Sequence, residues 1–296
     1  MTTRAMELPR PREQTLSGRL VEFISRWPVH LVLVGIAILW LVPSVGLLIT
    51  SFRPRPDIAS SGWWETFSTL NFTVDNYSNV LQAQRMGEGF RNSALITIPS
   101  TLLPLLLGAM AAYAFSWIRF PFRDTIFLVI VALMIIPIQM AFVPDLILFR
   151  RLGELNRSLA GIVIAHTTFA LPFAIFLLRN FFITLPKDLI EAARVDGALN
   201  FGIFYRVVLP LSVPALASFG IFQFLWVWND LLNALVFVQE SQWLPMTVRI
   251  TQLQATYGTE WHLMSAAAFI LMFVPLLVFF SLQRYFVQGL LAGSVK

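Results

Sequence analysis

Long stretches without a formal charge dominate the chain. Six windows of at least 20 residues contain no Asp, Glu, Lys or Arg. Each such residue at a bilayer centre costs roughly 2.5–3.5 kcal/mol, and about 20 residues of helix span the hydrocarbon core. The pattern predicts an all-α, polytopic membrane protein with six transmembrane helices, since helices satisfy their own backbone groups in lipid. The windows are Trp27–Phe52, Asn92–Ile118, Thr125–Pro144, Ser158–Leu178, Val207–Asn229 and Trp261–Gln283.

Composition supports the same fold class. The 296 residues are 57% hydrophobic and 12% charged, and the mean hydropathy is +0.73. Ordinary soluble domains carry about 25% charged residues, so a soluble globular protein is excluded. The sequence has no cysteine, which excludes disulfides, thiol catalysis and cysteine-based metal sites.

The basic residues favour one orientation. With the amino terminus inside, alternate connections place 13 of the 21 Lys and Arg residues inside, as the positive-inside rule prefers. Both termini are therefore predicted to be cytoplasmic, and topology accounts for the net charge of +5 without a nucleic-acid partner. The exception is the loop with Arg150, Arg151 and Arg157, which this orientation places outside. The first window is too long for a signal peptide and is predicted to be a retained anchor.

Proline is frequent within the windows. We expect kinks or packed irregularities there, because proline removes a backbone donor that neighbouring helices must compensate for. Both a packing role and a role in a moving pathway remain open. The residues are Pro43, Pro99, Pro104, Pro137, Pro172, Pro210 and Pro214.

Motifs for enzymatic chemistry are absent from the sequence. A phosphate-binding P-loop needs a Gly-Lys pair, and neither Lys187 nor Lys296 follows glycine. His30, His166 and His262 do not have metal-ligand spacing. The sequence therefore predicts neither an enzyme nor a cofactor or metal site on this chain, and it favours satisfied or interfacial roles for the histidines.

Carboxylates are also missing from the middle of the windows, which counts against an ion-coupled porter. The nearest ones, Asp145 and Asp230, lie at predicted outer ends. Asp230 follows Trp228 and Asn229, an aromatic and amide cluster. These three residues either hydrogen-bond a sugar hydroxyl in a substrate pathway or cap a helix at the membrane interface.

The loop 184–206 predicts a helix, a turn and a second helix on the inner surface. Pro186 suits a first helical turn, and Gly197 suits the left-handed position after a helix end. Leu189, Ile190 and Ala193 share one face. Lys187 precedes Glu191 in the weaker order for an i, i+4 ion pair, so Glu191 is available to another cation. The loop is either a docking element or a passive connector.

The same loop resembles the cytoplasmic loop of ABC importer permeases. It reads Glu-Ala-Ala-x-x-Asp-Gly-Ala over residues 191–198, with Leu209-Pro210 twelve residues after Gly197. Further matches cover most of the chain after the first window and point to the six-span, maltose-type permease of the carbohydrate importers. These are Asn76-Tyr77, the segments 90–93 and 111–114, Leu185-Pro186, Trp228-Asn229-Asp230 and the segment 283–286.

The resemblance implies a type I ABC importer architecture and a set of partners. These are a second permease subunit in a heterodimer, two copies of a cytosolic ATPase that holds ATP and Mg, and an extracytoplasmic sugar-binding protein. It implies a bacterial or archaeal cytoplasmic membrane, and it suggests an α-glucoside or related disaccharide as substrate. The residues that it assigns to coupling are Glu191, Ala192, Ala193, Asp196, Gly197, Leu209 and Pro210.

We expect four segments along the chain: a cytoplasmic tail (1–26), a first span with an outer loop (27–91), a permease core (92–285) and a second tail (286–296). Within the core, the outer segment 240–260 is long for a connection. Gln252 and Gln254 are predicted to contact the binding protein there, unless the segment is an ordered cap. The rival functions are an oligomeric channel or ion-coupled porter, and a membrane scaffold without transport.

Overall fold

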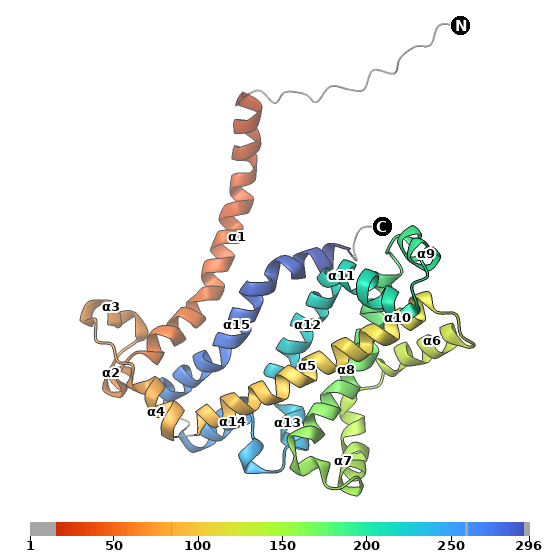
Figure 1. Cartoon of the computed structure of the whole chain (residues 1–296). Helices are drawn as coiled ribbons and strands as arrows, with labels where there is room; N and C mark the ends of the chain where they lie inside the picture. The colour runs from red at the N-terminus through yellow and green to blue at the C-terminus, as the bar shows by residue number, and fades with distance from the viewer. Residues whose placement is uncertain (1–15, 84, 258–259, 293–296) are drawn as a thin grey trace.

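The computed structural model describes residues 16–83, 85–257 and 260–292, and every regular element in these ranges is a helix (Figure 1). This confirms the all-α fold class. Residues 1–15 of the predicted first tail and 293–296 of the second lie outside the described residues.

Four helices are long and apolar enough to cross a membrane by themselves. They are α1 (Leu16–Ser51), α5 (Met86–Trp117), α8 (Leu159–Phe182) and α15 (Trp261–Ala292). Each contains one of the predicted charge-free windows nearly whole. The windows identify these spans because apolarity along a single helix is a local property of the sequence.

The other two windows are broken. Helix α6 (Arg123–Leu133) is bent by 92° against the segment Ile138–Arg151, which ends in α7 (Phe142–Arg151). The segment Asn200–Leu211 is bent by 77° against α12 (Val213–Trp228). The irregularities predicted from proline are confirmed at these two places. The described residues contain four helices that could span a membrane, or up to six spans if each bent pair is one span.

Prolines mark both breaks. Pro137 precedes the 3₁₀ turn Ile138–Ala141, and Pro210 and Pro214 flank Ser212 at the second bend. Pro43, Pro99, Pro104, Pro172 and Pro275 instead lie inside continuous helices. Proline content therefore predicted irregularity, but not its location.

Short helices complete the fold. They are α2 (Arg55–Ser60), α3 (Thr66–Thr69), α4 (Asp75–Ala83), α9 (Lys187–Val195), α10 (Asn200–Ile203), α11 (Leu209–Leu211), α13 (Leu232–Phe237) and α14 (Met246–Tyr257). The 3₁₀ turns are Trp63–Glu65, Ile138–Ala141, Leu155–Arg157 and Ser241–Trp243, and a π-helical turn covers Phe204–Val208.

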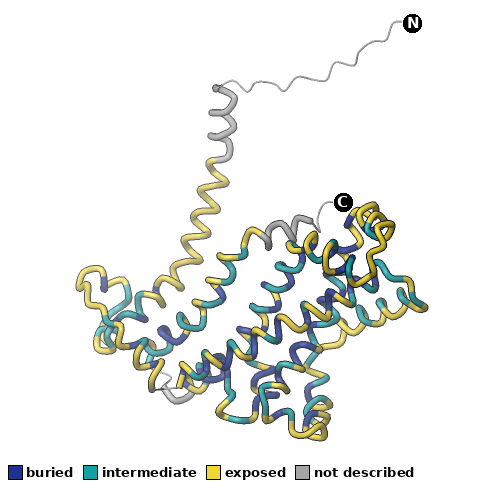
Figure 2. The backbone as a smooth tube through the Cα atoms, viewed as in Figure 1, coloured by how far each residue is buried: buried dark blue, intermediate teal, exposed yellow. Residues whose placement is uncertain are grey.

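The core forms where α5 packs along α8 and α12 packs against α5 and α15. Small residues permit the closest approach: a Cβ on Gly108 of α5 would lie 2.6 Å from Cβ of Ala174 of α8, as is common between membrane helices. Helix α1 contacts α15 near its C-terminal end but stands apart from the bundle over most of its length (Figures 1 and 2).

Candidate functional site

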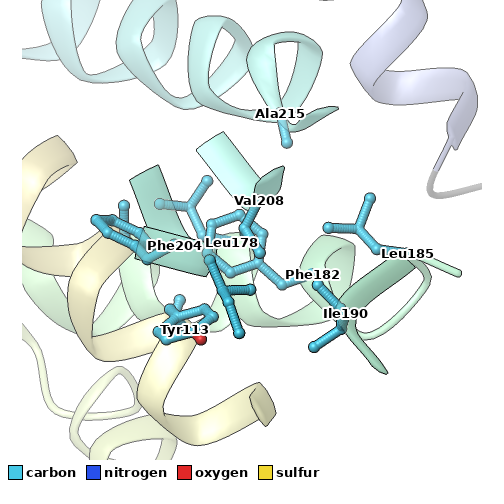
Figure 3. Packing of buried hydrophobic residues seen from close by; sticks show 11 residues of the cluster. Tyr113, Leu178, Phe182, Leu185, Ile190, Phe204, Val208 and Ala215 are labelled. Carbon is cyan, nitrogen blue, oxygen red and sulfur yellow. The ribbon is translucent and has the colours of Figure 1, made fainter. Parts of the chain in front are cut away.

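Helix α9 is fixed to one end of the bundle through one buried face. Ile190 is 1% exposed and packs in a cluster with Phe182, Leu185 and Val208 (Figure 3). Ala193 packs against the same cluster, and Nη2 of Arg194 donates a hydrogen bond to the Trp117 carbonyl at 2.9 Å. These contacts join α9 to the ends of α5 and α8.

The end of α9 has the backbone conformation that Gly197 predicted. Gly197 has φ +80°, and its N–H donates to the Arg194 carbonyl at 3.0 Å. The Ala198 N–H donates to the Ala193 carbonyl at 2.9 Å. This pair of bonds is a Schellman motif, in which glycine is the favoured residue at position 197.

The opposite face of α9 is open to solvent. Glu191, Ala192, Asp196 and Gly197 are all exposed. Arg194 binds the Trp117 carbonyl and, within the described residues, forms no ion pair with Glu191. Leu189, predicted to share the buried face, is 46% exposed. The exposed face of α9 therefore combines the carboxylate of Glu191, the small residue Ala192 and the apolar side chain of Leu189.

The chain returns from α9 to the membrane through the π-helical turn. Leu209 is partly buried against the same cluster as Ile190, whereas Pro210 is exposed and begins the bend into α12. Single π turns inside helices occur frequently at functional sites. One continuous path of packed residues thus connects α9 with α12.

Trp228, at the far end of α12, has a packing role. It is 2% exposed, and its Nε1–H donates to the Leu271 carbonyl at 2.9 Å. Pro275 of α15 lacks the N–H that would otherwise bond this carbonyl. The ring stacks on Phe224 and meets the edge of Phe90.

Asn229 and Asp230 bind backbone groups. Nδ2 of Asn229 donates to the Leu225 carbonyl at 2.8 Å. Oδ1 of Asp230 accepts from the Asn233 N–H at 3.3 Å, and Oδ2 accepts from the Ala234 N–H at 3.1 Å. Of the two interpretations of this cluster, the geometry favours helix capping, with Asp230 at the start of α13.

A cavity of about 360 Å³ lies beside this cluster, at the bend between α6 and α7. It combines aromatic walls with a few polar side chains, the usual composition of a small-molecule site. The lining residues are Leu133, Met134, Ile136, Pro137, Ile138 and Ala141 at the bend, His166, Thr168, Phe169, Ala170, Pro172 and Phe173 of α8, Gln223 and Trp226 of α12, and Asn233 of α13.

Two polar atoms of the cavity lining have unused hydrogen-bonding capacity. Nε2 of His166 lies 3.6 Å from Oδ2 of Asp230 and forms no hydrogen bond, although the residue is only 4% exposed. Oδ1 of Asn233 also has no partner, while its Nδ2 donates to Asp230 Oδ1 at 3.0 Å. Buried polar groups are normally satisfied, but both atoms have almost no accessible surface, so a ligand in the cavity meets them only if the side chains rotate toward it.

The comparisons with known proteins agree with this architecture. Residues 104–291 match the family model described as the binding-protein-dependent transport system inner membrane component. The chain belongs to this family. The match includes the α9 loop and the cavity lining of α8, α12 and α13, and it confirms the resemblance to importer permeases.

Relatives of this permease are similar over nearly their whole length. The osmoprotective compounds uptake permease protein GgtD of Synechocystis sp. is 47% identical over 95% of each chain. The alpha-glucoside transport system permease protein AglG of Rhizobium meliloti is 37% identical over 91% of this chain and 97% of its own. A chain of the crystal structure of a bacterial ABC transporter that imports alginate shares the fold, with TM-score 0.73, 24% identity, and coverage of 92% of the permease and 98% of that chain.

The sequence did not identify the cavity residues of the permease. The sequence favours a satisfied or interfacial role for His166, Gln223 lies in an apolar window without a motif, and Asn233 lies four residues after the end of that window. The unpartnered atoms can be recognised only when α8, α12 and α13 are placed together. The available sequence signal was weak: polar side chains within a charge-free window or just after its end.

The segment 240–260, predicted to lie outside, contains helix α14, on which Gln252 and Gln254 are exposed. Leu253 between them is 1% exposed and anchors the helix. Arg249 is buried one turn earlier and donates to the Ser241 carbonyl at 3.2 Å; burial lowers the pKa of its guanidinium, and the nearby Glu88 carboxylate opposes this. Residues 258 and 259 of the segment lie outside the described residues.

Proposed function

We propose that this permease is one membrane subunit of an ATP-driven sugar importer and that α9 is its coupling helix. The observation that carries the proposal is the division of α9 into two faces. Ile190 and Arg194 fix one face to the bundle, whereas Glu191 and Ala192 are presented to solvent. A passive connector has no need for an exposed acidic and small-residue surface on a firmly anchored helix.

ATP hydrolysis then acts on the membrane part through packed contacts. A cytosolic ATPase binds the exposed face of α9 with a basic group at Glu191, and it holds ATP and Mg. Movement of α9 passes through Ile190 and the π-helical turn to α12, because these share one buried cluster. α12 carries Gln223 and Trp226 of the cavity, so docking at the inner surface alters the cavity.

The substrate contacts the cavity at the α6–α7 bend. His166 and Asn233 line the cavity and each holds a buried polar atom without a partner, which a rotation of the side chain presents to the substrate. Trp226 and Phe169 supply apolar ring surfaces. This combination suits a sugar, which has hydroxyl groups at its edge and C–H groups on its faces. The substrate pathway was predicted at Trp228, Asn229 and Asp230. We place it instead at the neighbouring cavity residues, and Asp230 holds Asn233 in position through a hydrogen bond.

We infer an α-glucoside or related small glycoside as the substrate class. The support comes from similarity to relatives named for alpha-glucoside transport and for osmoprotective compounds uptake. The complete importer contains a second permease, two ATPase copies and an extracytoplasmic binding protein, which contacts Gln252 and Gln254. Both bent pairs act as single spans, which gives six spans with both termini cytoplasmic.

The deciding experiment compares Glu191→Ala with Asp188→Ala in the complex reconstituted into liposomes. Both carboxylates are exposed on α9, so Asp188 is a matched control. A desolvated charge-assisted contact is worth roughly 1.5–3 kcal/mol, equivalent to about ten- to hundredfold in binding of the ATPase. We expect Glu191→Ala to reduce ATP hydrolysis stimulated by the loaded binding protein, and Asp188→Ala to leave it near the wild-type value.

Equal activity of the two variants would show that α9 is a connector. Sugar uptake by the chain alone, without ATP or other subunits, would establish the channel or porter function instead. ATPase binding without sugar-dependent stimulation would establish the scaffold function.

A further inference from the structure

An apolar patch covers the loop that follows α1. Trp64, Phe67, Leu70, Phe72 and Val74 form this patch, and each is more than half exposed, with Leu70 at 69%. Exposed apolar surface of this extent on a structured segment marks a site of interaction with a protein or a membrane.

The loop is a fixed structure and not a free connection. The Thr73 N–H donates to the Phe52 carbonyl at 2.7 Å and closes its base. Nδ2 of Asn76 donates to the carbonyls of Ser51 and Arg53 at 2.8 and 2.9 Å. The Arg53 side chain is buried inside the loop and donates to backbone carbonyls of Asp57 and Ser61.

The loop folds back alongside α1 to the depth of the membrane. A Cβ on Gly46 would lie 2.9 Å from Nε1 of Trp63, the residue next to the patch. Gly46 precedes the loop base at Phe52 by six residues, which is about 9 Å along a helix that rises 1.5 Å per residue. The indole of Trp63 is therefore level with the interior of the charge-free window of α1.

The patch also borders a second long helix. Val74 of the patch lines an apolar groove of about 500 Å³ together with Ile270 and Phe273 of α15. Both α15 residues lie well inside the last charge-free window, Trp261–Gln283. The loop therefore lies against the apolar surfaces of two long helices, α1 and α15.

The backbone at Leu70 is consistent with a specific role for the patch. Leu70 ends α3 with φ +49°, a left-handed conformation that costs a residue with a side chain roughly 1–2 kcal/mol. This strained position holds a large apolar side chain that is exposed to solvent. Strain of this kind persists where the surroundings enforce it and often marks function.

We propose that the patch is a membrane-interface anchor whose partner is the lipid at the headgroup–acyl boundary. Trp, Phe and Leu are the side chains of segments that insert about 5–10 Å into this boundary, and the depth of Gly46 matches that range. In the proposed topology the leaflet is the outer one. The anchor sets the level of α1, which has few other contacts with the bundle (Figure 1).

The test measures depth with spin labels in the complete transporter in nanodiscs. The chain has no native cysteine, so Phe67→Cys can be labelled uniquely once the partner subunits are cysteine-free. Ser78→Cys on exposed α4 is the aqueous control, and Leu39→Cys in the middle of α1 is the deep control. We expect a label at Phe67 to be relaxed more by oxygen than by a water-soluble nickel chelate, as at Leu39, with the reverse at Ser78.

Two results would overturn the proposal. If a label at position 67 is relaxed more by the nickel chelate than by oxygen, as at position 78, the patch lies in water. A label shielded from both relaxants, and exposed again when the binding protein or the second permease is removed, shows that a protein covers the patch. Trp64→Cys repeats the measurement if Phe67→Cys does not assemble. The result is independent of the transported solute, so it is distinct from failure of the proposed sugar transport.

Discussion

Nε2 of Gln223 in α12 donates a hydrogen bond at 3.1 Å to the carbonyl of Ser100 in α5. Pro104, four residues after Ser100, has no N–H with which to make the helical bond to this carbonyl. The amide therefore replaces a backbone donor from a neighbouring helix, as membrane helices with proline require. In the same way, Nε1–H of Trp228 donates to the Leu271 carbonyl, which Pro275 of α15 leaves without its helical donor. Side chains of α12 therefore compensate for one proline in α5 and one in α15.

Gln223→Leu is expected to destabilise the permease by leaving the Ser100 carbonyl without a donor. Bonds between membrane helices are worth roughly 0.6–1.7 kcal/mol. Pro104→Ala restores an N–H to α5, so the loss should shrink in the double variant. SDS-induced unfolding of all four proteins measures this coupling, and strictly additive effects would contradict it.

Trp228→Phe should lose stability in the same way, because phenylalanine cannot donate to the Leu271 carbonyl. Trp226→Phe is the control, since Trp226 lies on the same helix and is 57% exposed. Adding Pro275→Ala should rescue only the Trp228 variant. Equal unfolding transitions for the two phenylalanine variants would show that the indole N–H is unimportant.

Gly197→Ala should impair coupling, because φ +80° is unfavourable for alanine. Gly202→Ala is the matched control, since Gly202 lies in α10 with no atom within 4 Å of an added Cβ. We expect only Gly197→Ala to lower uptake and stimulated ATP hydrolysis together, by roughly five- to thirtyfold for a cost of about 1–2 kcal/mol. Expression and membrane insertion of both variants should stay near normal. Similar uptake by both would argue against the Schellman motif as part of the docking surface.

Trp226→Ala should weaken sugar stimulation, because it removes an aromatic wall of the cavity. Leu235→Ala, at an exposed position of α13 outside the cavity lining, controls for loss of apolar surface. The expected result is a higher sugar concentration for half-maximal uptake with unchanged basal ATP hydrolysis. An unchanged half-maximal concentration would remove Trp226 from the pathway.

Orientation can be measured with single cysteines at Ser78 and Arg119, both exposed. In spheroplasts, a membrane-impermeant maleimide should label Ser78→Cys and not Arg119→Cys, and inverted vesicles should reverse this. Arg151→Cys tests the basic loop that the positive-inside rule fits poorly, and it should behave as Ser78→Cys. If Arg151→Cys is labelled in inverted vesicles and not in spheroplasts, as expected for Arg119→Cys, then α6 and α7 form a re-entrant loop.

The all-α membrane fold, the four long helices and the α9 loop can all be predicted without the structure. These depend on local properties: the apolarity of a window, the freedom of Gly197, and a motif within one short segment. The family resemblance could likewise be found from residues 191–198 and Leu209-Pro210 because their spacing is set along the chain.

Which prolines break a helix and which polar residues line a cavity depends on contacts between helices. Pro104 remains in a helix because Gln223, 123 residues from Ser100 in the chain, satisfies the freed carbonyl. His166 and Asn233 have unused hydrogen-bonding capacity because α8 and α13 bring both beside Asp230. Hydrogen-bond satisfaction depends on neighbours that are distant in sequence, whereas apolarity belongs to each residue alone.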